Sequence, residues 1–243
     1  MTGHVPLRVT AHLEAGVAQA APWGIALDGL LAGVIHQRAK SALLEAGGAH
    51  QPLAERDDVD DLDLPLARCA RGEDWHWAGT CARPVDGQQD RPDVRYWLGA
   101  ADPRDLEEVA EAMPGRLEIG QGRYRQHYMP LLTTVTSAVT WDAVGDPDII
   151  RDLVQNIWAI GKKRAAGQGR VLRWEVHPTD RDPWEAGHLH PDGAVGRPTP
   201  STCLPPEILN ENRHGGIGWA GLRAPYHHRS RQRRLVLPQL LDG

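Results

Sequence analysis

The sequence predicts an α+β fold, because segments with strand periodicity and segments with helix periodicity follow one another at both ends of the chain. A strand and a helix occur within residues 5–40, and a strand, a helix, a glycine-rich loop and a last strand occur within residues 129–176. This order is compatible with a ferredoxin-like, or RNA-recognition-motif-like, sheet. We expect a single domain, residues 1–243, with a mixed insertion at about 43–125 and a basic C-terminal extension at about 178–243.

The first two elements have clear periodicities. Residues 5–14 alternate roughly between apolar and other side chains, which predicts a strand. Residues 27–40 predict a helix with Asp28 available as its N-cap, fraying near Gly47 and Gly48. One face of that helix carries Leu27, Leu30, Leu31, Val34 and Ile35.

The pattern weakens in the predicted insertion. The acidic run at 55–63 is typical of an exposed loop, and residues 74–85 predict a strand with Trp75 and Trp77 on one face. Residues 102–115 predict a short acidic helix that ends at Pro114 and Gly115.

Periodicity returns in the second half. Residues 129–145 are rich in β-branched side chains and predict a bent strand or a hairpin. Residues 146–161 predict a helix capped by Asp146 with Pro147 in its first position, and residues 170–176 predict a strand. A further hairpin is possible across 216–238. We expect Trp141, Trp158 and Trp174 in the core, whereas Trp97, Trp184 and Trp219 lie nearer loops and could stack on bases or fill interfaces.

Charge is distributed unevenly along the chain. The net charge is −5, but residues 151–243 hold 14 of the 27 basic and only 9 of the 32 acidic side chains. This basic third suggests that a polyanion binds on one face, although chance and solvated surface charge are an alternative explanation.

Several classes of protein are disfavoured by composition. No apolar run approaches the ~20 residues of a membrane span, and the N-terminus lacks the pattern of a signal peptide. Three cysteines are too few for a disulfide framework, which fits a reducing cytosol. We therefore expect a cytoplasmic protein without a membrane partner.

The loop GKKRAAGQGR, residues 161–170, combines glycines with positive charge. It does not match a Walker phosphate loop, and it follows a helix rather than the strand that a Rossmann fingerprint requires. Its glycines would let main-chain N–H groups approach phosphate oxygens, and Lys162, Lys163 and Arg164 would supply charge. We predict contact with a phosphodiester backbone and no cofactor; the alternative is a helix C-terminus with Gly161 as its cap.

This loop also carries a family resemblance. The stretch IGKKRAAGQGRV, residues 160–171, resembles the C-terminal glycine-rich loop of the CRISPR-associated RAMP superfamily, and LDGLLAGVI, residues 27–35, is similar to its first helix. Residues 124–176, with RPTP at 197–200 and GLRAPYHHRSRQ at 221–232, resemble the Cas-five-like subunit that caps the crRNA 5′ handle in type IV effector complexes.

The resemblance implies a non-catalytic crRNA-binding subunit. Such a subunit holds the 5′ handle, packs against the backbone and large subunits of the effector, and helps to engage target DNA. Type IV complexes generally lack a subunit that cleaves the target. By the same resemblance, the RNA path would be contacted or shaped by Gly161, Lys162, Lys163, Arg164, Gly167 and Gly169, with Arg170 beside them.

The basic tail offers a second set of candidates. If residues 223–234 form a strand, Arg229, Arg231 and Arg233 share one face suited to RNA phosphates, and Tyr226 can stack on a base. Arg223 belongs to the same basic segment. The alternatives are a solvated tail or a protein-interface patch, as in a purely structural assembly subunit.

The same tail is the best case for catalysis. His227 or His228 could act as general base on a 2′-hydroxyl in a metal-independent crRNA-processing endoribonuclease. Neighbouring residues of a strand point to opposite faces, so at most one of the two would reach a given site. We expect no enzymatic activity.

A metal site is not indicated by spacing. Cys69, His76 and Cys81 lack the C-x2-C pairs of structural zinc sites and a clear fourth ligand, and the HLH at 188–190 is only a remote candidate. We expect buried or incidental cysteines and no metal.

Overall fold

A computed structural model describes residues 3–19, 21, 23–52, 56–71, 74–85, 92–99 and 127–239. The chain divides into two compact units, Met1–Arg91 with Thr134–Gly243, and Pro92–Thr133. The helix predicted at 102–115 lies outside the described residues.

The larger unit is built on a four-stranded antiparallel sheet in the order β4-β7-β1-β8. Strand β1, Val5–Leu13, pairs with β7, Ala138–Gly145, on one side and with β8, Val171–Pro178, on the other. The short strand β4, Arg83–Pro84, extends the sheet beyond β7. The strands predicted at 5–14 and 170–176 are thus confirmed, and the larger unit has mixed α/β structure.

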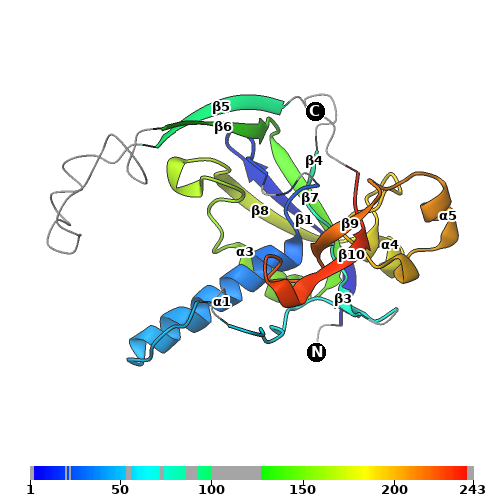
Figure 1. Ribbon diagram of the computed structural model, residues 1–243, viewed down its shortest axis with the longest axis horizontal. Coiled ribbons are helices and arrows are strands. Elements are labelled where there is room, and N and C mark those ends of the chain that lie inside the picture. The colour runs from blue at the N-terminus through cyan, green and yellow to red at the C-terminus, as the bar shows by residue number, and fades with distance from the viewer. Residues whose placement is uncertain are drawn as a thin grey trace, which may run out of the picture. The chain divides into compact units, whose positions relative to one another are not determined.

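One face of this sheet is covered by helices α1, Leu27–Glu45, and α3, Pro147–Val154 (Figure 1). The alternate residues of β1 point into this layer and are buried, as the strand pattern requires. The resulting core combines strand residues Leu7, Val9, Ala11, Val139, Trp141 and Val176 with helix residues Leu27, Leu31, Ile150, Leu153 and Val154.

The helices begin differently from one another. Asp146 caps α3 as predicted, because its Oδ1 accepts hydrogen bonds from the N–H groups of Asp148 and Ile149, at 3.0 and 3.1 Å. The prediction that Asp28 caps α1 is wrong: Ala26 is the N-cap residue and makes no side-chain cap. The side chain of Asp28 is fully buried and accepts a hydrogen bond from the Tyr226 hydroxyl.

Helix α3 ends at Val154, seven residues before the predicted end at 161. As a result, the prediction of a core position for Trp158 is wrong, and 63% of its surface is exposed. Trp141 is fully buried, and Trp174 packs against the core beside it, with ring centroids 5.7 Å apart.

The predicted strand at 74–85 is two short strands. Strand β3, His76–Trp77, pairs with β2, Arg68–Cys69, and each of these strands has two residues. Residues 78–82 separate β3 from β4. Trp75 and Trp77 do pack together, edge to face, with ring centroids 5.0 Å apart.

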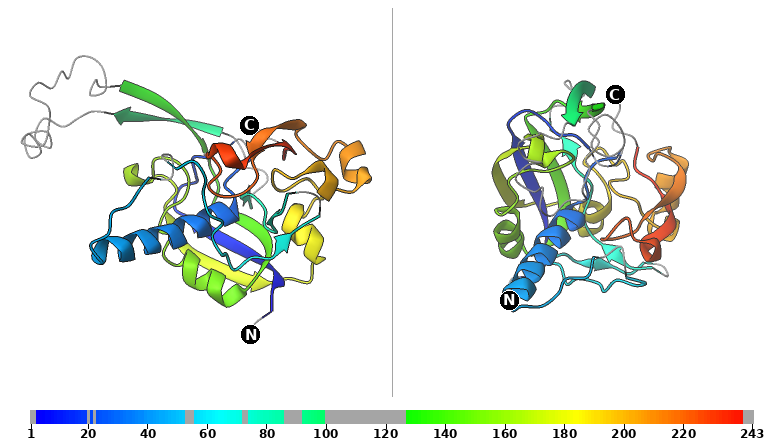
Figure 2. Two further views of the ribbon diagram at one scale, coloured as in Figure 1. Left: turned by 60° about the horizontal axis from the view of Figure 1, so that its bottom comes forward. Right: turned by 60° about the vertical axis from the view of Figure 1, so that its left-hand side comes forward.

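The C-terminal third contains short elements. They are helix α4, Pro183–His188, 3₁₀ helix η5, Ser201–Cys203, helix α5, Pro206–Asn210, strand β9, Ile217–Gly221, 3₁₀ helix η6, Arg229–Arg231, and strand β10, Gln232–Val236. Strands β9 and β10 form the predicted hairpin. Figure 2 shows this red C-terminal segment beside the first turns of α1, where Tyr226 reaches Asp28.

The smaller unit contains strand β5, Pro92–Gly99, paired with β6, His127–Thr134. The residues predicted as one bent strand or a hairpin, 129–145, therefore belong to two strands of separate sheets, β6 and β7. Among the described residues, no helix has the length and apolar character needed to cross a membrane.

Candidate nucleic-acid interface

Main-chain hydrogen bonds join the two ends of the glycine-rich loop and attach the loop to the segment after β1. Ile160 N–H donates to the carbonyl oxygen of Gly169 at 2.9 Å, and Lys162 N–H donates to that of Ala18 at 2.8 Å. Gly161 and Gly169 have φ of 83° and 65°, and a Cβ on either would collide with a backbone carbonyl oxygen. Both positions therefore require glycine for the loop to fold.

The helix-cap explanation for Gly161 is wrong, because α3 ends at Val154. The loop is instead a surface excursion between Ala159 and Arg170, which form a β-bridge. Its tip is the 3₁₀ helix η4, Arg164–Ala166, followed by the exposed Gly167 with φ of 80°.

The cations of this loop differ in their surroundings. Lys162 and Arg164 are exposed, and no carboxylate among the described residues pairs with either one. Lys163 is half-buried in a left-handed conformation with φ of 58°. Arg170 lies 3.5 Å from Glu14. Lys162 and Arg164 are thus the loop cations whose charge is available to an anion.

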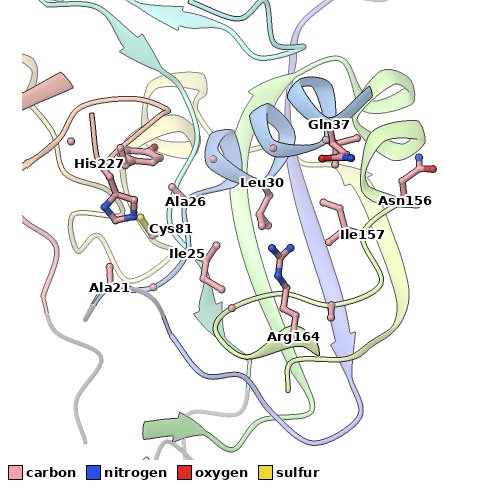
Figure 3. Close-up of a pocket in the computed structure, with 18 of the residues that line it drawn as sticks. Ala21, Ile25, Ala26, Leu30, Gln37, Cys81, Asn156, Ile157, Arg164 and His227 are labelled. Atoms are coloured by element: carbon pink, nitrogen blue, oxygen red, sulfur yellow. The ribbon is translucent and has the colours of Figure 1, made fainter. Parts of the chain in front are cut away.

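A large groove lies beside this loop. Its volume is about 1130 Å³, and its wall includes Gly29, Leu30 and Gly33 of α1 together with Gly161 and Arg164 of the loop. Figure 3 shows Arg164 directed into the groove toward Leu30, with Gln37 and Asn156 at one end and His227 at the other. A Cβ at Gly33 would meet no atom within 4 Å, whereas Gly29 gives room to the Tyr226 ring, which a Cβ there would approach to 3.1 Å.

Two exposed tryptophans line the same groove. Trp158 precedes the glycine loop, and Trp219 lies on β9 with 74% of its surface exposed. Large exposed aromatic rings beside a cation are a common arrangement for stacking nucleic-acid bases next to a bound phosphate. Trp219 is thus exposed, as the prediction that it could stack on bases requires. Trp158 was not predictable as a stacking residue, because the apolar spacing does not reveal that α3 ends at Val154.

Four arginines of the C-terminal tail are paired with carboxylates. Arg223 and Arg231 both lie 2.8 Å from Asp61, Arg229 lies 2.6 Å from Asp57, and Arg233 lies 2.9 Å from Asp74. Asp57 and Asp61 of the acidic run, together with Asp74, therefore neutralise most of the positive charge of the tail.

The predicted single face of arginines is also wrong. Arg229 and Arg231 belong to η6, the strand β10 begins only at Gln232, and Arg231 is buried with its guanidinium donating to the Val59 carbonyl oxygen. The alternation of side chains expected for a strand over 223–234 is interrupted by the 3₁₀ helix η6, which the sequence of the tail does not indicate.

Tyr226 and the two histidines take separate positions. The half-buried ring of Tyr226 packs on Gly29, and burial of its hydroxyl beside Asp28 raises the pKa of Tyr226. His227 is exposed and lines the groove. His228 instead hydrogen-bonds Ser230 Oγ at 2.8 Å and the Arg56 carbonyl oxygen at 3.0 Å. Only one of the two histidines therefore faces the groove.

Two of the three cysteines lie together, and the third, Cys81, lies apart from them. Cys81 is buried, and burial raises the pKa of its thiol to about 12. Cys69 and His76 lie together as the sequence analysis considered, but their neighbours are His188 and Cys203 rather than Cys81. These four residues come from four short segments, so no local spacing indicated them; the HLH at 188–190 was the only hint.

The chain matches one family model, described as CRISPR type IV associated protein Csf3, over residues 5–215. The match includes the whole four-stranded sheet, α1 and the glycine-rich loop, and it ends before β9. A search of curated proteins finds no match.

Proposed function

Because the chain belongs to the family of CRISPR type IV associated protein Csf3, we propose that it is the crRNA-binding subunit that caps the 5′ handle in a type IV effector complex. In this role it contacts the backbone and large subunits and contributes to engagement of target DNA. The protein acts by binding and does not cleave RNA.

The arrangement of the sheet supports this assignment. Along the chain, α1 lies between β1 and β4, and α3 lies between β7 and β8. In the sheet order β4-β7-β1-β8, each of these two pairs of strands has one other strand between its members. We infer that this is a ferredoxin-like sheet of the split β-α-β type, with β4 as its shortened second strand. Such a sheet would be the RAMP scaffold on which the glycine-rich loop precedes the last strand.

The groove beside the glycine-rich loop carries the proposal. It brings together two exposed tryptophans, Trp158 and Trp219, and Arg164, which pairs with no carboxylate in the described part of the chain. A single-stranded 5′ handle would place phosphates against Arg164 and Lys162 and stack bases on the tryptophan rings. The protein has a net charge of −5, so attraction of RNA depends on such a local site rather than on the whole surface.

The tail arginines have no leading role in this proposal. Their carboxylate partners Asp57, Asp61 and Asp74 would have to be displaced before a phosphate could take their place. Arg231 is buried as well. We therefore expect the loop cations to dominate the salt dependence of binding.

The test is a binding titration of a fluorescent crRNA 5′-handle oligonucleotide at several salt concentrations. The double variant Lys162→Ala with Arg164→Ala should bind more weakly, and the slope of log K against log[salt] should fall in magnitude by about 1.4, since each phosphate contact to a single strand contributes about 0.7. The matched control is Arg173→Ala with Arg213→Ala, which removes two exposed cations outside the groove.

Stacking is tested separately by Trp158→Ala, because this exposed ring can be removed without opening the core. Loss of one stacked base costs about 1–3 kcal/mol, or roughly 5- to 150-fold in affinity. Tyr128→Ala removes an exposed ring of the smaller unit and serves as its control. Unchanged affinity in both groove variants would instead support a purely structural assembly subunit.

The endoribonuclease alternative has one supporting observation, the exposed His227 in the groove. Incubation of the pure protein with repeat RNA in the absence of metal tests it. Specific cleavage that is lost in His227→Ala and retained in His228→Ala would replace the binding assignment with an enzymatic one.

A further inference from the structure

Four potential metal ligands converge on the side of the fold that carries α4. Cys69 and His76 face each other across the β2–β3 hairpin, His188 is the last residue of α4, and Cys203 is the last residue of η5. Their sulfur and nitrogen atoms all lie within 4.8 Å of one another. His76, His188 and Cys203 are buried, and Cys69 is half-buried.

The distances among these atoms fit a tetrahedral ion. The two Sγ atoms lie 3.4 Å apart, and the Nε2 atoms of His76 and His188 lie 2.9 Å apart. Cys203 Sγ lies 4.0 Å from His76 Nε2 and 3.5 Å from His188 Nε2. Zinc bonds of about 2.3 Å to sulfur and 2.0–2.1 Å to nitrogen place tetrahedral ligands about 3.3–3.8 Å apart. Small movements of the side chains would therefore centre the ion.

The histidines present the required lone pairs. His188 Nδ1 donates a hydrogen bond to the Trp184 carbonyl oxygen at 2.7 Å, which leaves Nε2 unprotonated and directed at the cluster. Trp184 also stacks on the His188 ring at a centroid distance of 5.1 Å and fixes its orientation. His76 is fully buried, and its Nε2 lies 2.9 Å from that of His188.

We propose that Cys69, His76, His188 and Cys203 bind one Zn²⁺ ion in a closed, four-coordinate structural site. Two nitrogen and two sulfur ligands in a tetrahedron are characteristic of zinc, whereas iron–sulfur clusters usually take four cysteines. Binding releases the two thiol protons, and two thiolates with one Zn²⁺ form a neutral unit that suits a buried site.

The ion would join segments that have little regular structure of their own. Strands β2 and β3 have two residues each, α4 has six and η5 has three. Close packing already brings these parts together, because a Cβ at Gly187 would lie 2.7 Å from Ala78 Cβ. The zinc site thus crosslinks the β2–β3 hairpin to the C-terminal third, next to the sheet that supports the groove.

The first measurement is the zinc content of the untagged full-length protein. We expect one zinc per chain, retained through gel filtration, and the same content in Cys81→Ala, which changes the cysteine outside the cluster. Cys203→Ser and His188→Ala should lose the metal. Chelation of zinc from the wild-type protein should lower its melting temperature, and added Zn²⁺ should restore it.

Replacement of zinc by Co²⁺ identifies the ligands even if the variants fail to fold. The wild-type protein and Cys81→Ala should both show the intense visible absorption of tetrahedral Co²⁺ and a thiolate-to-metal charge-transfer band. A folded wild-type protein that contains no zinc and gives neither band with Co²⁺ would overturn the proposal. A Cys69–Cys203 disulfide found by mass spectrometry in protein isolated without added oxidant would also overturn it.

Discussion

A buried ion pair links the beginning of α1 to the C-terminal third of the chain. Asp28 and Arg197 are both fully buried, with 3.7 Å between Oδ2 and the guanidinium nitrogen. The Arg197 guanidinium also donates to the carbonyl oxygens of Gly79 at 3.1 Å and Leu222 at 2.8 Å, and to that of Trp77. Arg197 therefore connects α1, the β3–β4 segment and the end of β9.

Substitutions at the two ends of this pair should differ in cost. Asp28→Asn keeps an acceptor for Tyr226 but leaves the Arg197 charge buried without a counterion, which typically costs about 3–5 kcal/mol. Arg197→Met leaves the Asp28 carboxylate buried without its counterion and removes the donor to three carbonyl oxygens. The Trp77 oxygen keeps the Gly79 N–H, but those of Gly79 and Leu222 lose this donor, at about 1–3 kcal/mol each. Since a domain has about 5–15 kcal/mol of stability in all, Arg197→Met should be at the limit of folding.

Urea unfolding followed by tryptophan fluorescence measures both variants, with the transition midpoint and its slope giving the free energy of unfolding. The control is Asp152→Asn, which breaks the exposed pair with Arg38 and should cost less than about 1 kcal/mol. The reasoning is refuted if Asp28→Asn costs no more than this control, or if Arg197→Met is milder than Asp28→Asn.

Three further changes test local features of the fold. Asp146→Ala should cost about 1 kcal/mol in urea unfolding, because it removes the acceptor of two N–H groups at the start of α3. Gly169→Ala should reduce soluble yield and stability more than Gly167→Ala. Both glycines have positive φ, but only a Cβ at Gly169 would meet a backbone oxygen, that of Ile160. Equal effects of the two substitutions would contradict the structural role of Gly169. Burial acts to raise the pKa of Asp192, but the Ala194 N–H and Arg83 outweigh it and lower that pKa. Asp192→Asn should therefore lose up to about 1 kcal/mol at pH 7, and the difference from wild type should disappear as the pH falls through the lowered folded pKa of Asp192.

The elements that could be predicted from sequence are those with a strong local pattern. The alternation at 5–14, the apolar spacing at 27–40 and the Asp146-Pro147 start of α3 each depend on residues close in the chain, and each is confirmed. The end of α3 was missed because Ile157 continues the helical spacing, although it joins the core from outside the helix.

Much of the candidate site could not be predicted, because it depends on contacts between distant segments. The loop at 161–170 was recognisable from its composition, but the groove beside it also needs Gly29, Gly33 and Trp219, which come from α1 and β9. The tail arginines looked available because their carboxylate partners Asp57, Asp61 and Asp74 are about 160–170 residues away in sequence. The cysteine and histidine cluster was hidden for the same reason.

The central position of β1 has a consequence for how the polypeptide is made. Val9 lies opposite Trp141 on one side and Val176 on the other, so among the described residues β1 has no strand partner until β7 has been translated. Pairings at such long sequence separation form slowly and leave unsatisfied strand edges exposed meanwhile. Fragments that stop before residue 171 should therefore aggregate, because β1 then lacks its partner β8.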